Sequence, residues 1–184
     1  MHDTCIDSNT PIIPHRSKYY ERNSSAQLIN VPEVDSSYKY AGGGILSTTG
    51  DLVKFGNYML DSYQNNLTSD QLHIKSETIK TLIWFPHSEI PCTDKEINDK
   101  FIDMDRIKTS YGFGWFLDKN KVLDRLECAY HTGGAVGASS CLLIAPSSVR
   151  TEGGIVVSVL CNTQNLKKIV KFTKSLAELF VNDL

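Results

Sequence analysis

The sequence lacks the features that mark several large classes of protein. Its 184 residues carry a formal net charge of −2, so no basic excess favours binding to nucleic acid or to an anionic membrane surface. No apolar run approaches the roughly 18 residues that cross a bilayer, so no transmembrane segment is expected. The first thirty residues contain acidic side chains and no long apolar stretch, which is typical of neither a secretory signal nor a transit peptide.

Cysteine, histidine and glycine do not form the spacings used for metals or cofactors. The five cysteines are odd in number and include no C-x-x-C pair, so we expect no disulfide framework and a thiol-reducing compartment. The five histidines show no ligand spacing such as H-E-x-x-H, so we expect no metal. Three glycines at 42–44 lack the residues of a phosphate-binding loop, and no cofactor is predicted.

Helical spacing begins after an irregular stretch over residues 1–40, which prolines interrupt. Thr48 is a predicted N-cap, with Asp51 three residues on as in a capping box. The apolar face of the following helix comprises Leu52, Phe55, Gly56, Met59, Leu60 and Tyr63. A second, short helix is predicted over residues 77–84, capped by Ser76 and ended by the approaching Pro86.

The second half of the chain has the pattern of strands. A long loop over residues 86–108 is predicted, followed by three strands over residues 111–117, 139–145 and 154–160. Asn165 is the predicted cap of a last helix, whose inward face comprises Leu166, Ile169, Val170, Thr173, Leu176, Ala177 and Phe180. The lysines of this segment, at positions 167, 168, 171 and 174, are expected on a solvated face.

These elements predict one domain of the α/β class (α+β type), an antiparallel sheet packed by helices. Within residues 1–184 we expect an irregular lead-in over 1–40, a helical part over 41–108, and sheet strands with a C-terminal helix over 109–184. The composition, with 41% hydrophobic and 22% charged residues, is that of an ordinary globular protein.

Four segments carry a family resemblance: residues 41–55, 111–115, 131–143 and 154–162. In order and spacing they resemble the C-terminal half of class C β-lactamase-type serine hydrolases, a superfamily that includes penicillin-binding proteins and related esterases and peptidases. The stretches Y-K-Y-A-G-G-G from Tyr38 and H-T-G-G-A-V-G-A-S-S from His131 are most similar to the mitochondrial serine β-lactamase-like branch found in animals. The resemblance implies an incomplete β-lactamase/transpeptidase-like fold.

The resemblance also implies a set of site residues. The family uses an S-x-x-K nucleophile, a Y-x-N-type proton-transfer partner and a [KH]-T-G strand beside the substrate. His131, Thr132 and Gly133 match the third motif, with Thr132 and Gly133 expected to contact substrate. The N–H of Gly134 is expected to be one of two oxyanion-hole donors, and two adjacent glycines suit a close approach of the substrate.

His131 stands where β-lactamases usually carry lysine. An imidazole is mostly neutral at pH 7 and is no permanent cation. This weakens recognition of a penicillin carboxylate and favours ester or peptide substrates.

The other two motifs have only partial matches. Ser36 and Lys39 fit S-x-x-K, and Tyr63 with Asn65 fits Y-x-N. Ser36 lies in a proline-broken region without a helix to align Lys39, and Tyr63 extends the apolar face of the predicted helix. We therefore expect the nucleophile and its base upstream of this chain. G-A-S-S-C at residues 137–141 is one residue from G-x-S-x-G, but a strand is expected there.

Two functions follow from these observations. The first is the C-terminal part of a serine β-lactamase-like hydrolase of the peptidase or esterase type, which alone is inactive and acts on a small-molecule or peptide substrate. The second is a non-catalytic scaffolding or self-assembling protein with the same fold. An upstream S-x-x-K would favour the first, and a start at Met1 the second. The resemblance implies a mitochondrial location, which no residue of this sequence encodes.

Overall fold

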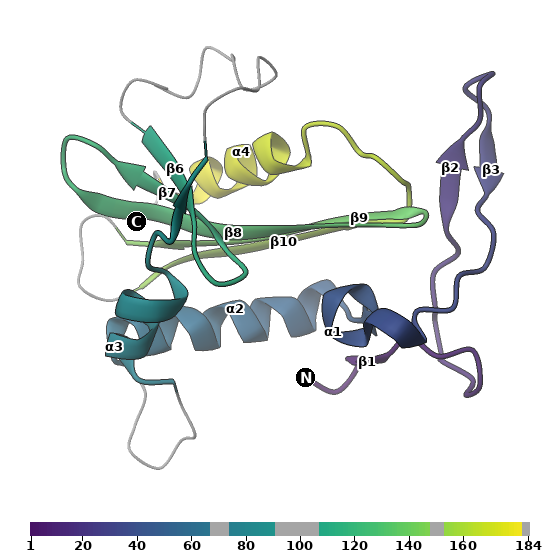
Figure 1. Cartoon of the computed structure of the whole chain (residues 1–184), viewed down its shortest axis with the longest axis horizontal. Coiled ribbons are helices and arrows are strands. Elements are labelled where there is room, and N and C mark those ends of the chain that lie inside the picture. Colours follow the sequence, from purple (N-terminus) through teal and green to yellow (C-terminus); the bar gives the residue numbers. More distant parts are fainter. Residues whose placement is uncertain (67–73, 91–106, 148–152, 182–184) are drawn as a thin grey trace.

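The computed structural model describes residues 1–66, 74–90, 107–147 and 153–181. Its centre is a six-stranded antiparallel sheet in the order β10-β9-β8-β7-β6-β5. Helix α2 (Thr49–Gln64) covers one face and helix α4 (Ile169–Val181) the other, and both contact β9 and β10 (Figure 1). The strands are β5 (Ser88–Glu89), β6 (Ile107–Tyr111), β7 (Phe116–Asn120), β8 (Arg125–Ala135), β9 (Ala138–Pro146) and β10 (Gly154–Cys161). The predicted antiparallel sheet packed by helices is confirmed.

Two apolar cores lie on the two faces of the sheet. Side chains of β8 alternate between them, since Ala129 belongs to the core under α2 whereas Cys128 and Tyr130 belong to the core under α4. The α2 core includes Met59 and Leu60, which are almost fully buried. β10 contributes to both cores and is half-buried except at Leu160, which is exposed. The predicted cover on both faces thus holds for the part of the strand before Leu160.

Helix α2 begins where the sequence predicted. The hydroxyl of Thr48 accepts a hydrogen bond from the Asp51 N–H at 3.2 Å. The helix ends at Asn65, which adopts the left-handed conformation with φ of 63°. Of its predicted apolar face, Gly56, Met59 and Leu60 are buried, whereas Leu52 and Tyr63 are part-buried and Phe55 is exposed.

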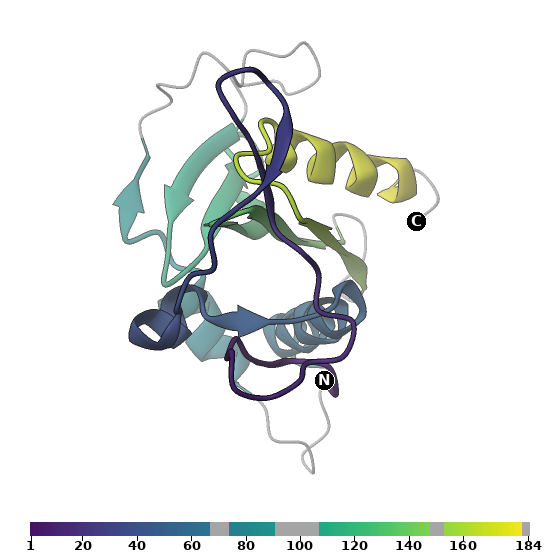
Figure 2. The same cartoon turned by 90° about the vertical axis from the view of Figure 1, so that its right-hand side faces the viewer.

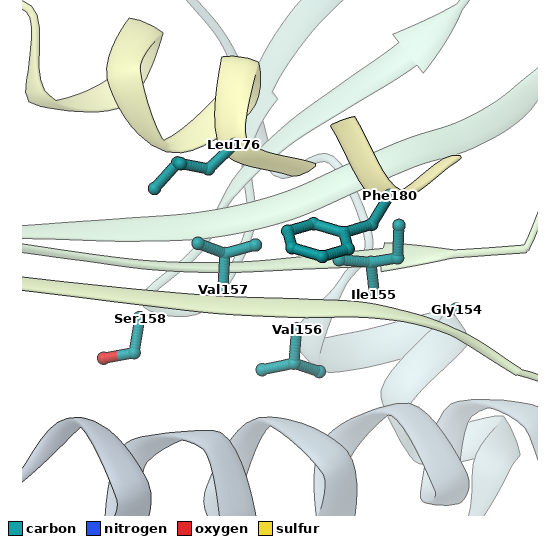
Figure 3. A pocket seen from close by; sticks show the side chains of 7 residues that line it. All are labelled: Gly154, Ile155, Val156, Val157, Ser158, Leu176 and Phe180. Carbon is teal, nitrogen blue, oxygen red and sulfur yellow. The ribbon is translucent and has the colours of Figure 1, made fainter. Parts of the chain in front are cut away.

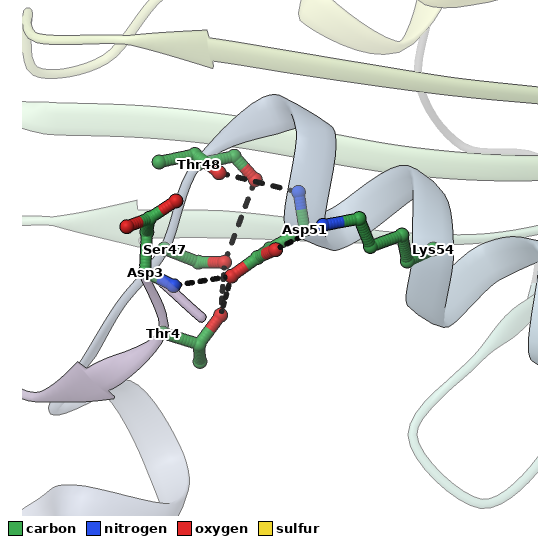
Figure 4. Close-up of polar contacts among 6 residues, drawn as sticks. All are labelled: Asp3, Thr4, Ser47, Thr48, Asp51 and Lys54. Atoms are coloured by element: carbon green, nitrogen blue, oxygen red, sulfur yellow. Dashed lines mark hydrogen bonds and ion pairs between the residues drawn. The ribbon is translucent and has the colours of Figure 1, made fainter. Parts of the chain in front are cut away.

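Asp51 ties the start of α2 to the N-terminal segment (Figure 4). Its buried carboxylate accepts hydrogen bonds from the Asp3 N–H at 2.8 Å and the Thr4 hydroxyl at 2.9 Å, and pairs with Lys54 at 3.1 Å. Burial disfavours the charge, but these hydrogen bonds outweigh burial and lower the pKa of Asp51 to about 2. The adjoining strand β1 (Cys5–Ile6) pairs with β4 (Ile45–Leu46).

The rest of the lead-in is mostly irregular, as predicted, but includes a small hairpin. Strands β2 (Tyr20–Arg22) and β3 (Leu28–Asn30) pair with each other and not with the central sheet. Figure 2 shows this segment crossing the end of the sheet between the two helix layers. A 3₁₀ turn η1 (Ser37–Lys39) and a short helix α1 (Tyr40–Gly43) lead into β4.

The prediction of a single strand over residues 111–117 is wrong. The chain reverses between β6 and β7, and the N–H of Gly112 donates to the carbonyl of Trp115 at 2.8 Å. Gly114 has φ of 75°, a conformation that glycine adopts without a steric penalty. The predicted loop over 86–108 also contains β5 and the start of β6, while residues 91–106 lie outside the described part of the chain.

Two predicted helix starts are displaced. The second helical segment consists of α3 (Ser76–Thr78) and a π-helical turn η2 (Ile79–Ile83), with Lys75 and not Ser76 at the N-cap. The Ser76 hydroxyl instead donates to the Tyr63 carbonyl at 2.6 Å. α4 begins four residues after Asn165, at Ile169.

The lysine face predicted on α4 is also partly wrong. Lys174 is only 17% exposed and forms an ion pair with Asp118 of β7, so its ammonium points into the sheet–helix interface. Among the described residues, no helix is long and apolar enough to cross a membrane.

Candidate functional site

The predicted substrate strand is one arm of a tight β-hairpin. β8 and β9 pair from Ala129 to Ala135, and the last pair, Ala135 with Ala138, leaves a turn of only two residues. In such a hairpin the pair that flanks the turn is hydrogen-bonded, and bonded and non-bonded pairs then alternate along the strands. The register therefore fixes which backbone groups of β8 point toward β9.

The alternation directs the backbone groups of Thr132 and Gly134 away from β9. On that side β8 pairs with β7, and the pairing stops where Phe116 lies opposite Tyr130. No strand among the described residues pairs with Thr132 or Gly134 on that side. Two N–H groups and two carbonyls of the H-T-G segment thus line an open sheet edge.

Side chains of the same segment lie on alternate faces of the sheet. Positions 131 and 133 share the face of Ala129, toward α2, so the His131 side chain projects from this face and not along the open edge. A Cβ on Gly133 would lie 2.2 Å from the Ser140 hydroxyl oxygen, so a larger residue there would have to displace this hydroxyl. A Cβ on Gly134 would meet nothing within 4 Å. His131 is exposed, and its ring centroid lies 6.5 Å from that of Phe116.

A buried polar cluster lies behind this strand, on the α4 side. Lys174 pairs with Asp118, and its ammonium lies 4.9 Å from the centroid of the Tyr130 ring. Asp118 also accepts from the Thr109 hydroxyl at 2.7 Å. Burial, followed by the charge of Asp118, raises the pKa of the Tyr130 phenol and of the Cys128 thiol, so both stay protonated at neutral pH. The cluster holds α4 on the sheet and offers no reactive thiolate.

Ser36 and Lys39 do not form the arrangement that S-x-x-K requires. They flank a single 3₁₀ turn in place of a long helix, and the Lys39 ammonium lies 5.5 Å from the centroid of the exposed Tyr38 ring. A serine nucleophile needs its base within hydrogen-bond reach, about 3 Å. Ser36 is nevertheless buried, which the sequence did not predict.

Tyr63 has a packing role, as predicted. Its ring lies 5.1 Å from that of Trp84, and burial raises the pKa of its phenol. Asn65, the other half of the Y-x-N match, is the helix C-cap. The C-terminal end of α2, which carries both residues, lies at the end of the molecule away from the β8–β9 turn (Figure 1).

The remaining sequence signals also resolve into structural roles. Ser139 lies in β9 and not on a nucleophile elbow, and its hydroxyl donates to the carbonyl of Thr163 at 2.8 Å. Gly42 and Gly43 belong to the four-residue helix α1. Within the described ranges, no group of three or more histidine, cysteine or acidic side chains could hold a metal ion.

Sequence reasoning missed the residues that hold the β8–β9 turn. The side chain of Gln164 accepts from the N–H of Gly137 at 3.0 Å, and Ser139 bonds to two residues of the same loop. Gln164 belongs to no recognisable sequence motif, and its contact with Gly137 spans 27 positions. The glycine at position 137 was therefore the one indication in the sequence of a constrained turn. Gly137 has φ of 77°, and a Cβ there would lie 2.5 Å from that of Tyr19.

The chain is similar to known proteins along most of its length. The sequence model of the family described as Beta-lactamase matches residues 1–178. The human protein named "Serine beta-lactamase-like protein LACTB, mitochondrial" is 38% identical over 185 residues, which cover 90% of this chain and 32% of that protein. The mouse protein of the same name is 36% identical over 204 residues, covering 97% and 35%. The chain thus spans about a third of the length of these relatives.

Proposed function

The chain belongs to the beta-lactamase family, and from this premise we propose that it supplies the substrate-strand half of a serine acyl-transfer site. In this proposal β8 lies beside the substrate, and the nucleophile and its base belong to residues outside these 184. The relatives are named serine β-lactamase-like proteins, which supports the serine-hydrolase chemistry.

The observation that carries the proposal is the open edge of β8 at Thr132 and Gly134. An extended substrate can add to this edge, with its backbone bonded to the strand as in β-strand addition. The Gly134 N–H then points at the acyl carbonyl and stabilises the oxyanion that forms during attack. A second N–H, that of the nucleophilic serine, completes the oxyanion hole. Thr132 bonds the substrate from the same edge, and Gly133 keeps the strand close to its neighbour.

The residue type at position 131 supports one class of substrate over another. His131 is exposed at the start of the open edge, at the position where β-lactamases usually carry a lysine. A histidine side chain, as a residue type, is no permanent cation. An ester or a peptide is therefore a better substrate than a penicillin, whose carboxylate needs a cation.

An apolar groove between β10 and α4 supports a larger assembled domain (Figure 3). The groove has a volume of about 560 Å³, and Leu176 and Phe180 of α4 face Ile155 and Val157 of β10 across it. β10 is the outer strand of the sheet among the described residues, and it contains no charged side chain. Stable proteins protect such a sheet edge from pairing with other chains. We propose that β10 is protected by residues that correspond to the part of the relatives' sequences outside the match with this chain.

A mitochondrial location forms part of the same proposal. The human, bovine and mouse relatives all carry the word mitochondrial in their names.

The test compares two substitutions at Gly134 in an extended polypeptide, defined as a transcript product that includes this chain and an upstream S-x-x-K. Gly134→Pro removes the outward N–H without removing a bond to β9, and proline is tolerated on a strand edge. We expect ester hydrolysis to fall about 10²–10³-fold, the usual effect of losing one oxyanion donor.

Gly134→Ala is the matched control, because it keeps the N–H and its Cβ has free space. It should retain turnover. Equal activity of the proline and alanine variants would contradict the proposed role of the Gly134 N–H. The absence of ester hydrolysis in every extended polypeptide would contradict the proposal that the protein is an enzyme. A non-catalytic, self-associating protein is then the remaining candidate, which the uncovered edge of β10 favours.

A further inference from the structure

The β8–β9 turn is held by two segments that come from opposite ends of the chain. The Gly137 N–H donates to Oε1 of Gln164 at 3.0 Å, and its carbonyl accepts from the Tyr20 N–H at 3.4 Å. The Gln164 N–H in turn donates to the Tyr20 carbonyl at 2.9 Å. These three hydrogen bonds form a closed ring, here called the turn clamp, made of Tyr20, Gly137 and Gln164. Figures 1 and 2 both show the N-terminal segment beside the end of the hairpin.

A second contact ties the same loop to the residue opposite Gly134. Ser139 pairs with Gly134 across the hairpin and is only 6% exposed. Its hydroxyl donates to the Thr163 carbonyl at 2.8 Å and accepts from the Leu166 N–H at 3.1 Å. The loop between β10 and α4 is therefore bonded to both the turn and the strand partner of Gly134.

The clamp leaves no room for a side chain at the turn. A Cβ on Gly137 would lie 2.5 Å from Cβ of Tyr19 and 2.8 Å from Cγ2 of Val31. The N-terminal segment thus packs directly on the turn in addition to bonding it.

The position of these contacts matters because the other edge of β8 is open. Among the described residues, the strand has a neighbour on one side only beyond Tyr130, namely β9. The end of such a hairpin opens easily unless other groups hold it. An oxyanion donor, by contrast, must stay within a fraction of an ångström of its productive position. The turn clamp is the only described hydrogen-bonded ring at this end of the hairpin.

We propose that Gln164 is a positioning residue, which fixes the Gly134 amide by accepting a hydrogen bond from Gly137 of the turn. A single residue pair, Ala135 with Ala138, separates that turn from the pair of Gly134 with Ser139. The inference rests on the proposed function, since it assigns Gln164 a role in the same acyl-transfer step. Gln164 touches no reacting atom. It acts through Gly137, from whose N–H it accepts a hydrogen bond. Its effect should therefore appear in the rate of acylation more than in the binding of substrate.

The side-chain oxygen of Gln164 accepts the hydrogen bond from Gly137, so substitutions that keep or remove an acceptor at position 164 test the role of this bond. Gln164→Leu has a similar shape but no acceptor, whereas Gln164→Glu keeps an acceptor. Gln164→Asn keeps the amide but withdraws it by one methylene. Gln27→Leu is the matched control, because the Gln27 side chain also accepts a hydrogen bond, at 3.2 Å from Asn23, but in the exposed β2–β3 turn.

In the extended polypeptide, Gln164→Leu and Gln164→Asn should lower kcat for an ester substrate about 10- to 100-fold with little change in KM, as expected for a donor displaced by up to 1 Å. Gln164→Glu should restore most of the turnover, and Gln27→Leu should leave it unchanged. In the 184-residue chain, peptides that cover the β8–β9 turn should exchange amide hydrogens faster in Gln164→Leu than in Gln164→Glu or Gln27→Leu.

Several results would overturn the inference. Unchanged exchange at the turn in Gln164→Leu would show that the clamp does not hold it. Full turnover in both Gln164→Leu and Gln164→Asn, in a protein that Gly134→Pro inactivates, would remove the positioning role and leave the proposed function intact. Turnover that is insensitive to Gly134→Pro would overturn the proposed function, and this inference with it.

Discussion

At the scale of single residues, the proposed site consists of backbone groups whose direction is set by strand register. Thr132 and Gly134 present N–H and C=O to an open edge because Ala135 and Ala138 close a two-residue turn. Gly133 has a different role, since a Cβ there would displace the Ser140 hydroxyl, which lies 2.2 Å from its position. The two adjacent glycines therefore have separate roles, one in packing and one in the proposed chemistry.

Asp51 gives a pH-dependent prediction at this scale. Its pKa is lowered from 3.8 to about 2 in the folded chain, so its contribution to stability is present above pH 3.8 and is lost as the pH falls toward 2. We expect the free energy of unfolding of the wild-type chain to fall more steeply between pH 4 and pH 2 than that of Asp51→Asn. Urea unfolding at each pH measures this difference. Parallel pH profiles for the two proteins would contradict the role of the Asp51 network.

The sequence predicted contacts between neighbouring residues but not contacts between residues far apart in the chain. Thr48 and Asp51 predicted the start of α2 because a cap is formed by residues three apart. Burial of Asp51 beneath Asp3 and Thr4 depends on contacts that span 48 and 47 positions, and no sequence pattern encodes them. The motif at His131 likewise identified the strand, but the open edge beside Thr132 depends on where β7 stops.

At the scale of elements, helix α4 is anchored on the sheet by a buried ion pair. Lys174 and Asp118 are 17% and 5% exposed, and Thr109 supplies a further hydrogen bond to the carboxylate. Helical periodicity placed Lys174 in a basic series with three other lysines, which is why the sequence predicted a solvated face. The partner of Lys174 lies 56 positions away on β7, so periodicity alone could not identify the pair.

Removing Lys174 should destabilise the chain strongly. Lys174→Met fills the same space but leaves Asp118 buried without its cation, which typically costs about 3–5 kcal/mol. Lys171→Met, one helical turn earlier and part-exposed, is the comparison on the same helix. Chemical unfolding should give a much lower midpoint for Lys174→Met than for Lys171→Met. Similar midpoints would contradict the anchoring role.

The same pair predicts a loss of stability in alkali. Burial lowers the pKa of Lys174, but the charge of Asp118 outweighs it and raises the pKa above the ordinary 10.5. The stabilisation is therefore complete below pH 10.5 and is lost as the pH rises through the raised pKa.

Local sequence pattern did not predict where the chain turns between β6 and β7. The aromatic stretch over residues 111–117 has strand propensity throughout, and the reversal inside it depends on glycine conformations that propensity does not specify. Gly114 at φ of 75° and the bond from Gly112 to Trp115 split the stretch into two strands. The continuous apolar sequence of β10, by contrast, was sufficient to predict that helices pack on both faces of this strand.

At the scale of the whole molecule, the groove between β10 and α4 should make the isolated chain bind hydrophobic dyes. Phe180 of the groove is 59% exposed, and Phe113, in the β6–β7 turn, is 56% exposed. We expect Phe180→Asp to reduce dye fluorescence clearly and Phe113→Asp, of matched exposure, to reduce it little. A wild-type chain that unfolds in one sharp transition and binds no dye would contradict the proposal that residues outside this chain pack on the groove between β10 and α4.

The central claim is that these residues supply the substrate strand and not the nucleophile. The most direct measurement is labelling of the 184-residue chain with a fluorophosphonate probe, followed by mass spectrometry. Ser36 is the serine of the S-x-x-K match, but a 3₁₀ turn presents it and the Lys39 ammonium lies against Tyr38. We expect no labelling above a heat-denatured control, and no change in Ser36→Ala. Stoichiometric labelling that disappears in Ser36→Ala would contradict the claim and make this chain a complete enzyme.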